Sequence, residues 1–418
     1  MYLDDAVVTG RALVRSACSV LDEYVLHYGA APVPDGGLED PGPLVLAALL
    51  AGISGVPAAR GAAARLWANR SRYPGPYVLG LFDGGLAGHL LALATAADAA
   101  GSLRGSRPLT LRRLADRNRD RVAAAASIVP WRRDHGGWPD YDLISGPAGT
   151  LLSLAVEPPC PADECVPVVE RLIALCDADD LGRLRVGEYR DDPVRGFNYG
   201  RVNTGVGNGV SGVALALVAA ADIGALPGSG RAALRRIGRW LIAQSFVDGR
   251  GMRTWAPVGR DDPPVAADGV GTARIRGASC RQAWCHGTPG IAWTLWEIAR
   301  VLGDATLRGV AVEAAASFIA AFDGDFHLAG HYPDKVGICH GAAGLMLLFD
   351  AFHRHADLPG ARALSEFCAA FLVARLDRVV AGTGTDHTLL TGSTGALAAL
   401  LTHGHDGNRS WLRALGLR

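Results

Sequence analysis

One short pattern recurs along most of this 418-residue chain: a glycine, two residues, a second glycine and then an apolar run. The pattern occurs six times, with its first glycine at Gly85, Gly146, Gly209, Gly287, Gly341 and Gly392. The copies lie roughly 50 to 80 residues apart, a period typical of repeated helical units. The repeat therefore argues against a chain of several unrelated domains.

Each repeated unit is expected to contain two helices. The run after each glycine pair is apolar on nearly all faces, which is typical of a helix buried on every side. Between these runs lie amphipathic stretches, such as the one in which Leu234, Ile237 and Leu241 recur among arginines. Buried inner helices surrounded by amphipathic ones predict an all-α fold, a closed α/α toroid (barrel) of helical hairpins whose inner helices start at Gly-x-x-Gly. We expect one such domain over residues 1–418, with loop-rich insertions at 158–199 and 248–277 near its mouth.

Composition and charge exclude several other classes of protein. Lys+Arg 41 and Asp+Glu 41 give a formal net charge of +0, so we expect no nucleic-acid partner. The most apolar stretch, residues 44–59, is too short and too interrupted to span a membrane, and no signal peptide is evident, so we expect a cytoplasmic protein. The 8 cysteines are thinly spread, which favours metal or thiol chemistry over a disulfide framework.

Two of the six units carry metal-ligand residue types directly before the glycine pair: Trp284-Cys285-His286-Gly287 and Cys339-His340-Gly341. Both cysteines lie two residues before a first glycine, so a toroid places them on adjacent inner-helix starts. His340 can reach the same point. Two thiolates and an imidazole form a soft donor set that suits zinc and leaves a fourth position open, as in catalytic sites. The sequence therefore predicts one catalytic Zn²⁺ held by Cys285, Cys339 and His340, whereas a single such cysteine would be an ordinary core residue.

These motifs, together with Asp142-Leu-Ile-Ser-Gly146 upstream, resemble the signature of the lanthionine synthetase C-like cyclases. The glycine-pair repeats resemble that family's α/α toroid from about Leu81 to Leu401. In this family two cysteines and a histidine bind zinc, which matches the three residues predicted above. Its bacterial members close thioether rings in lanthipeptides by adding a peptide cysteine to dehydroalanine or dehydrobutyrine.

The resemblance implies a zinc-dependent lanthipeptide cyclase that forms lanthionine and methyllanthionine rings. Its substrate would be a dehydrated precursor peptide, leader plus core. A separate lanthipeptide dehydratase would supply this peptide, because the chain carries no kinase-like or lyase-like motif. Two alternatives stay open: addition of glutathione to dehydroamino acids, and a non-catalytic toroid that binds zinc and peptide as a partner of the dehydratase.

Thiolate addition to the β-carbon of a dehydroamino acid generates an enolate, which must be stabilised and then protonated at the α-carbon. Arg281 matches an arginine of the family motif and is expected to stabilise the enolate oxygen. Asp142 matches an acidic residue of the family and is expected to orient a proton donor or a substrate amide. For both residues the alternative is a structural ion pair on the barrel rim.

The third unit departs from the family pattern. Family members usually carry a histidine with an acid/base role directly before the first glycine, where this chain has Asn208. An amide donates and accepts hydrogen bonds but does not exchange a proton near neutral pH. We expect Asn208 to line the site as a hydrogen-bond donor. His286 is the nearest replacement acid, with support of the metal ligands or packing as its alternative role, and His327 and His331 are further candidates.

Overall fold

The computed structural model describes residues 2–28, 40–53, 80–82, 84–97, 136–156, 159–260, 282–329, 335–381, 386–404 and 408–418. Within these ranges the chain is mostly helical. The strands there are β1 (Phe246–Val247) and β2 (Arg253–Thr254), which pair antiparallel as a short hairpin. No helix in the described part of the chain is both long enough and apolar enough to cross a membrane.

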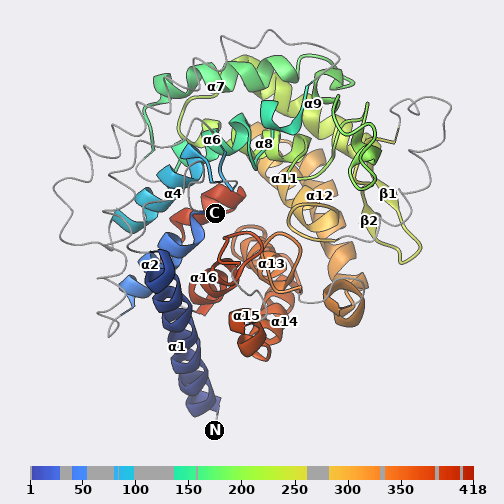
Figure 1. The fold of residues 1–418 in the computed structure, drawn as a ribbon. Helices are drawn as coiled ribbons and strands as arrows, with labels where there is room; N and C mark the ends of the chain where they lie inside the picture. Colours follow the sequence, from blue (N-terminus) through green and yellow to red (C-terminus); the bar gives the residue numbers. More distant parts are fainter. Residues whose placement is uncertain are drawn as a thin grey trace.

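Seven of the described helices form a closed inner ring, in which each helix contacts the next and the last returns to the first (Figure 1). In chain order they are α2 (Gly42–Gly52), α4 (Leu86–Ala97), α6 (Pro147–Leu154), α8 (Val210–Asp222), α11 (Thr288–Leu302), α13 (Ala342–Ala356) and α16 (Ser393–Gly404). Most of their side chains are buried, and in α8 every residue from Val210 to Ala220 is. The predicted α/α toroid is confirmed.

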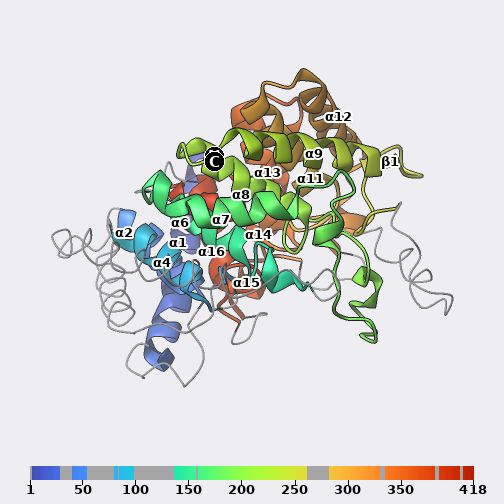
Figure 2. The ribbon, with the colours of Figure 1, turned by 90° about the horizontal axis from the view of Figure 1, so that it is seen from above.

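An outer layer of helices covers this ring. It consists of α1 (Tyr2–Tyr28), α7 (Ala162–Leu175), α9 (Gly228–Gln244), α12 (Ala305–Ala321), α14 (Ala361–Val373) and α15 (Leu376–Ala381). The amphipathic pattern decides which face of α9 turns inward, since Leu234, Ile237 and Leu241 are buried while its arginines lie outside. Figure 2 shows α7 and α9 side by side outside α8. Helix α7 occupies part of the segment 158–199, which was expected to be loop-rich.

Short helical turns lie in the connections between these helices. They are η2 (Trp138–Asp140), η3 (Gly182–Leu184), η4 (Gly196–Asn198), the π-helical turn η5 (Asp325–Ala329) and η6 (Ser410–Leu415).

The second glycine of each pair is required by a close backbone approach. A Cβ at Gly149 would overlap the carbonyl oxygen of Leu143, and a Cβ at Gly344 would overlap that of Ile338. In both units the loop folds back against the first turn of its own inner helix, and only glycine leaves room for this carbonyl. The same contact recurs in the other glycine-pair units. The repeated glycine therefore fixes how each loop enters the mouth.

Backbone hydrogen bonds join the loop before one inner helix to the loop before the next. The bonds run from Leu143 N–H to Gly207 O (3.1 Å), Val206 N–H to Cys285 O (2.8 Å), Cys285 N–H to Cys339 O (3.4 Å) and Cys339 N–H to Leu390 O (2.8 Å). Each acceptor lies two residues before the first glycine of its unit, and we call this place the mouth position. Side chains at mouth positions of successive units are thereby brought to neighbouring points of one rim.

Helix α2 is an inner helix that the glycine pattern did not predict. It begins at Asp40-Pro41-Gly42-Pro43 and has no second glycine, so only its apolar run marked it in the sequence. In the loop before α2 the side chain of Asp40 replaces the usual carbonyl. Its Oδ1 accepts hydrogen bonds from Gly42 N (2.8 Å) and from Leu389 N of the preceding unit in the ring (2.6 Å).

Candidate metal centre and catalytic site

Three side chains that could bind a soft metal ion meet at the mouth of the toroid. The ligand atoms of Cys285, Cys339 and His340 all lie within 4.8 Å of one another. Cys339 Sγ is 3.5 Å from His340 Nε2. A tetrahedral zinc ion with usual Zn–S and Zn–N bond lengths separates a sulfur and a nitrogen ligand by about 3.5 Å. The donor set and its spacing therefore fit zinc.

The repeat explains how these ligands come together. Cys285 and Cys339 occupy mouth positions of adjacent units, before α11 and α13 respectively, and the Cys285 N–H bonds to the Cys339 carbonyl. His340 follows Cys339 directly, so the same loop supplies two of the three ligands. Cys285 is 3% exposed, whereas Cys339 and His340 are half-buried. The group is thus accessible from the side of Cys339 and His340.

A carboxyl–amide pair lies on the two preceding units. Asp142 precedes α6 and Asn208 precedes α8, and Asn208 Nδ2 donates to Asp142 Oδ2 at 2.6 Å. The other carboxyl oxygen accepts the backbone N–H groups of Ser145 (2.9 Å) and Gly146 (2.8 Å) at the start of α6. Both oxygens of the buried carboxyl are therefore engaged.

The environment of Asp142 holds its proton unusually tightly. Burial raises the pKa of Asp142 from its ordinary value to about 7, and the hydrogen bonds from Ser145, Asn208 and Gly146 offset only part of this rise. Desolvation dominates because the carboxyl is 0% exposed. A carboxyl with this pKa exchanges protons near neutral pH, which an ordinary aspartate does not.

The pair and the metal ligands belong to one continuous rim. Leu143, next to Asp142, bonds to the carbonyl of Gly207, and Val206 bonds to the carbonyl of Cys285. Gly207 shares the mouth position with the two cysteines, and a Cβ added to it would lie 3.5 Å from Cys285 Cβ. The sequence motifs did not single out Gly207. Its alignment with Cys285 and Cys339 relative to the glycine pair is the signal that could have found it.

The other residues that the sequence suggested for the site lie in different places. The ring of His286 lies against the loop before α8, since a Cβ on Gly205 would be 3.0 Å from His286 Nε2. His327 of η5 is buried, stacked on Phe322 and edge-on to Phe318. Arg281 and His331 lie outside the described residues.

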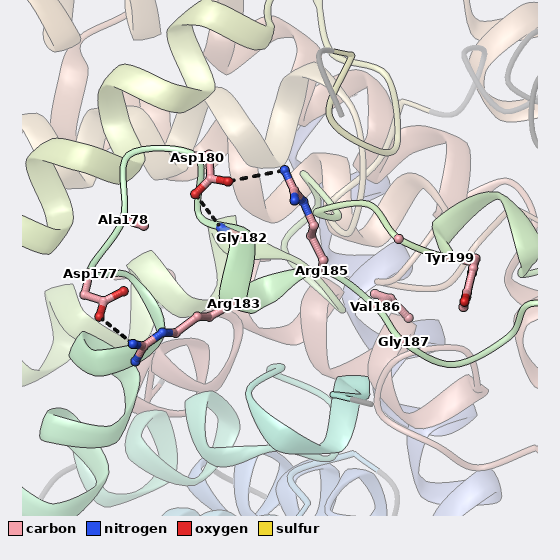
Figure 3. A pocket seen from close by; sticks show the side chains of 10 residues that line it. Asp177, Ala178, Asp180, Gly182, Arg183, Arg185, Val186, Gly187 and Tyr199 are labelled. Atoms are coloured by element: carbon pink, nitrogen blue, oxygen red, sulfur yellow. Dashed lines mark hydrogen bonds and ion pairs between the residues drawn. The ribbon is translucent and has the colours of Figure 1, made fainter. Parts of the chain in front are cut away.

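A separate pocket of about 660 Å³ opens on the connection between α7 and α8 (Figure 3). Two ion pairs line it, Arg183 with Asp177 at 3.0 Å and Arg185 with Asp180 at 3.3 Å. The pocket contains none of the site residues predicted from the sequence, and its lining charges already neutralise each other. We therefore place the chemistry at the mouth and assign no function to this pocket.

The fold and this group together define an α/α-toroid protein with three side chains at its mouth that could hold a soft metal ion. The sequence matches the family model described as "Lanthionine synthetase C-like protein" over residues 65–415. The chain therefore belongs to the lanthionine synthetase C-like family.

Among solved structures the chain is similar to one titled "Nisin cyclase". The TM-score is 0.76 at 18% sequence identity, and the match covers 96% of each chain. At this identity the similarity establishes the toroidal fold. No curated protein matches the sequence.

Proposed function

We propose that this chain is a zinc-dependent lanthipeptide cyclase. It would add cysteine thiolates of a dehydrated precursor peptide to dehydroalanine or dehydrobutyrine, forming lanthionine and methyllanthionine rings. The observation that carries the proposal is the Cys285–Cys339–His340 group at the mouth of a toroid of the lanthionine synthetase C-like family. A separate dehydratase would provide the substrate peptide.

Cys285, Cys339 and His340 would hold the metal, which when bound supplies a Lewis acid that keeps a thiol deprotonated at neutral pH. The reaction forms one C–S bond at the β-carbon and moves the π electrons of the alkene toward the carbonyl. One proton must then reach the α-carbon. The thiol proton released earlier balances this uptake.

Asp142 is the group that we propose to deliver this proton. Its pKa of about 7 keeps a large share of the carboxyl protonated at neutral pH, and the hydrogen bonds to Oδ1 and Oδ2 fix its position. Asn208 orients this acid and does not exchange the proton itself. Arg281 would stabilise the enolate oxygen, and His286 would support the wall of the site from its place against Gly205.

The test is ring closure by the purified protein on a dehydrated peptide, with and without glutathione, read by mass spectrometry after blocking residual thiols. A cyclase gives a product with fewer alkylatable thiols at unchanged peptide mass. An adduct that gains the mass of glutathione would instead support the glutathione reading. A zinc-loaded protein that binds the peptide and leaves it unchanged would support the non-catalytic reading that Asn208 raises.

A further inference from the structure

Residues 410–418 fill the middle of the ring, and we call them the bore plug. Figure 1 shows the end of the chain, marked C, inside the circle of inner helices. Trp411, Leu412 and Leu415 are each 0% exposed, and η6 contacts α4 and α6. The plug is therefore part of the core beneath the mouth.

Charged side chains on three inner helices fix this segment. Arg418 donates to Glu297 of α11 at 2.9 Å, and Arg413 pairs with Asp222 at the end of α8 at 3.3 Å. Just before the plug, Arg409 binds Asp350 of α13 at 2.6 Å. Glu297 and Asp350 are buried, so these contacts hold more firmly than exposed ion pairs would. The plug consequently has a defined position relative to the ring.

Two indoles bind the backbone of the plug. Trp284 Nε1 donates to the carbonyl of Leu415 at 2.9 Å, and Trp293 Nε1 donates to the carbonyl of Gly416 at 2.8 Å. Gly416 has φ 69°, a left-handed conformation that glycine adopts without strain. Trp293 lies within α11. Trp284 is different, because it stands directly before the ligand Cys285.

We infer that the bore plug positions the metal ligand Cys285 by holding the indole of Trp284. The indole is 1% exposed and its edge meets the ring of Phe82 with centroids 6.3 Å apart, so its hydrogen bond to Leu415 leaves it little rotational freedom. The Cys285 backbone continues directly from this anchored residue and bonds to Cys339 O. Groups that hydrogen-bond to a metal ligand and orient it typically change metal affinity 10- to 100-fold when they are lost, which sets the scale for a partner one residue away.

This inference rests on the proposed metal site, and a pair of variants distinguishes a failure of the inference from a failure of the metal site. Trp284→Phe removes the N–H donor beside Cys285 but keeps an aromatic ring. Trp293→Phe removes the neighbouring N–H donor to the same plug and leaves the ligand loop intact. Binding of Co²⁺ to the metal-free protein is followed by its thiolate absorption, and zinc affinity by competition with a chelator.

We expect Trp284→Phe to weaken Co²⁺ and zinc binding about 10-fold and to alter the Co²⁺ spectrum. Trp293→Phe should keep the native spectrum and lose no more than about 2-fold in metal affinity. Both variants should lower the melting temperature of the metal-free protein by a similar amount. Native affinity and spectrum in Trp284→Phe would overturn the inference, as would equal losses in both variants. If the native protein itself bound no metal, the proposed function would fail instead.

A second variant keeps the test decisive if Trp284→Phe does not fold. Gly416→Ala is strained at φ 69° and presses on Leu215, so it displaces the Leu415 carbonyl without touching the ligand loop. A folded Gly416→Ala protein should show the same weakened metal binding. Unchanged binding in that variant would contradict the positioning role of the plug.

Discussion

Asn208 Nδ2 lies 2.6 Å from Asp142 Oδ2, although the two residues are 66 positions apart in the chain. The contact joins the loop before α8 to the loop before α6 on one side of the metal ligands. It combines a buried acid, whose pKa is about 7, with an amide that does not gain or lose a proton near neutral pH. A proton exchanged by this pair therefore belongs to Asp142.

The first prediction concerns the pH dependence of folding. Burial raises the pKa of Asp142 from an ordinary 3.8 to about 7, so the folded protein retains this proton between about pH 4 and 7 while the unfolded chain loses it. The free energy of unfolding should consequently fall through this window, by on the order of 4 kcal/mol, and level off above pH 7. Asp142→Asn removes the titration, and its Oδ1 can still accept the N–H groups of Ser145 and Gly146.

Urea unfolding of both proteins at pH 5 and pH 8, in the presence of a chelator, measures this contribution. The difference in unfolding free energy should shift in favour of Asp142→Asn as pH rises. An unchanged difference at the two pH values would show that Asp142 is ionised in the folded protein.

A second prediction addresses the replacement of the family's histidine. Asn208→His places a group that titrates near neutral pH beside Asp142, so ring closure at pH 7 should become about 10-fold faster. The control Asn208→Ala removes the hydrogen bond to Oδ2 and should be slower than the native protein. Equal or slower ring closure by Asn208→His would mean that proton transfer does not limit the native rate.

The toroid could be predicted because the glycine requirement is local and repeats six times. Each second glycine faces a carbonyl of its own loop, so the pattern marks every unit that uses this contact. Helix α2 escaped prediction because it carries no glycine pair, and in its loop the side chain of Asp40 accepts the bond from Leu389 N.

The grouping of Cys285 with Cys339 and His340 could also be anticipated, because equivalent positions in adjacent units must be neighbours. The bond between Asp142 and Asn208 could not be anticipated, since it depends on rotamers and on how far two loops lean together. The raised pKa of Asp142 follows from complete burial, which cannot be predicted from its position in a loop before a helix. The sequence likewise does not show that aromatic side chains enclose His327, which it offered only as a further candidate.

The third prediction is that the purified protein contains one zinc ion per chain. Removing one thiolate from a three-ligand site lowers affinity steeply, so Cys339→Ser should retain well under half of the metal after dialysis. Cys368→Ser is the matched control, because Cys368 is a buried thiol in α14 away from the mouth. Metal analysis of the three proteins decides the point. Full zinc content in Cys339→Ser would contradict the assignment of this ligand.

The fourth prediction tests the role of the second glycine in folding. A Cβ at position 344 overlaps the carbonyl of Ile338, so Gly344→Ala should lower the free energy of unfolding by about 3 kcal/mol. Gly309 lies in the outer helix α12 with open space around it, and Gly309→Ala should raise stability by about 0.5 to 1 kcal/mol. Chemical denaturation of both variants measures the contrast. Similar effects at the two sites would show that the carbonyl contact does not constrain the repeat.

The last prediction uses the one mouth position near the metal ligands, within the described residues, that has no side chain. A Cβ at Gly207 would lie 3.5 Å from Cys285 Cβ and 3.7 Å from Ile144 Cδ1, which is ordinary contact, so Gly207→Ala should bind zinc and close rings almost as the native protein does. The additional methyl groups of Gly207→Val would project beside the ligand side chains of Cys285 and Cys339, which extend from the equivalent positions of their own units. Gly207→Val should therefore keep its zinc and lose at least about 10-fold in kcat/KM for the dehydrated peptide, because the peptide needs this space to place its reacting atoms within attack distance. Steady-state kinetics beside metal analysis measures both quantities. Equal kcat/KM in the alanine and valine variants would mean that the substrate approaches the metal ligands from another side of the mouth.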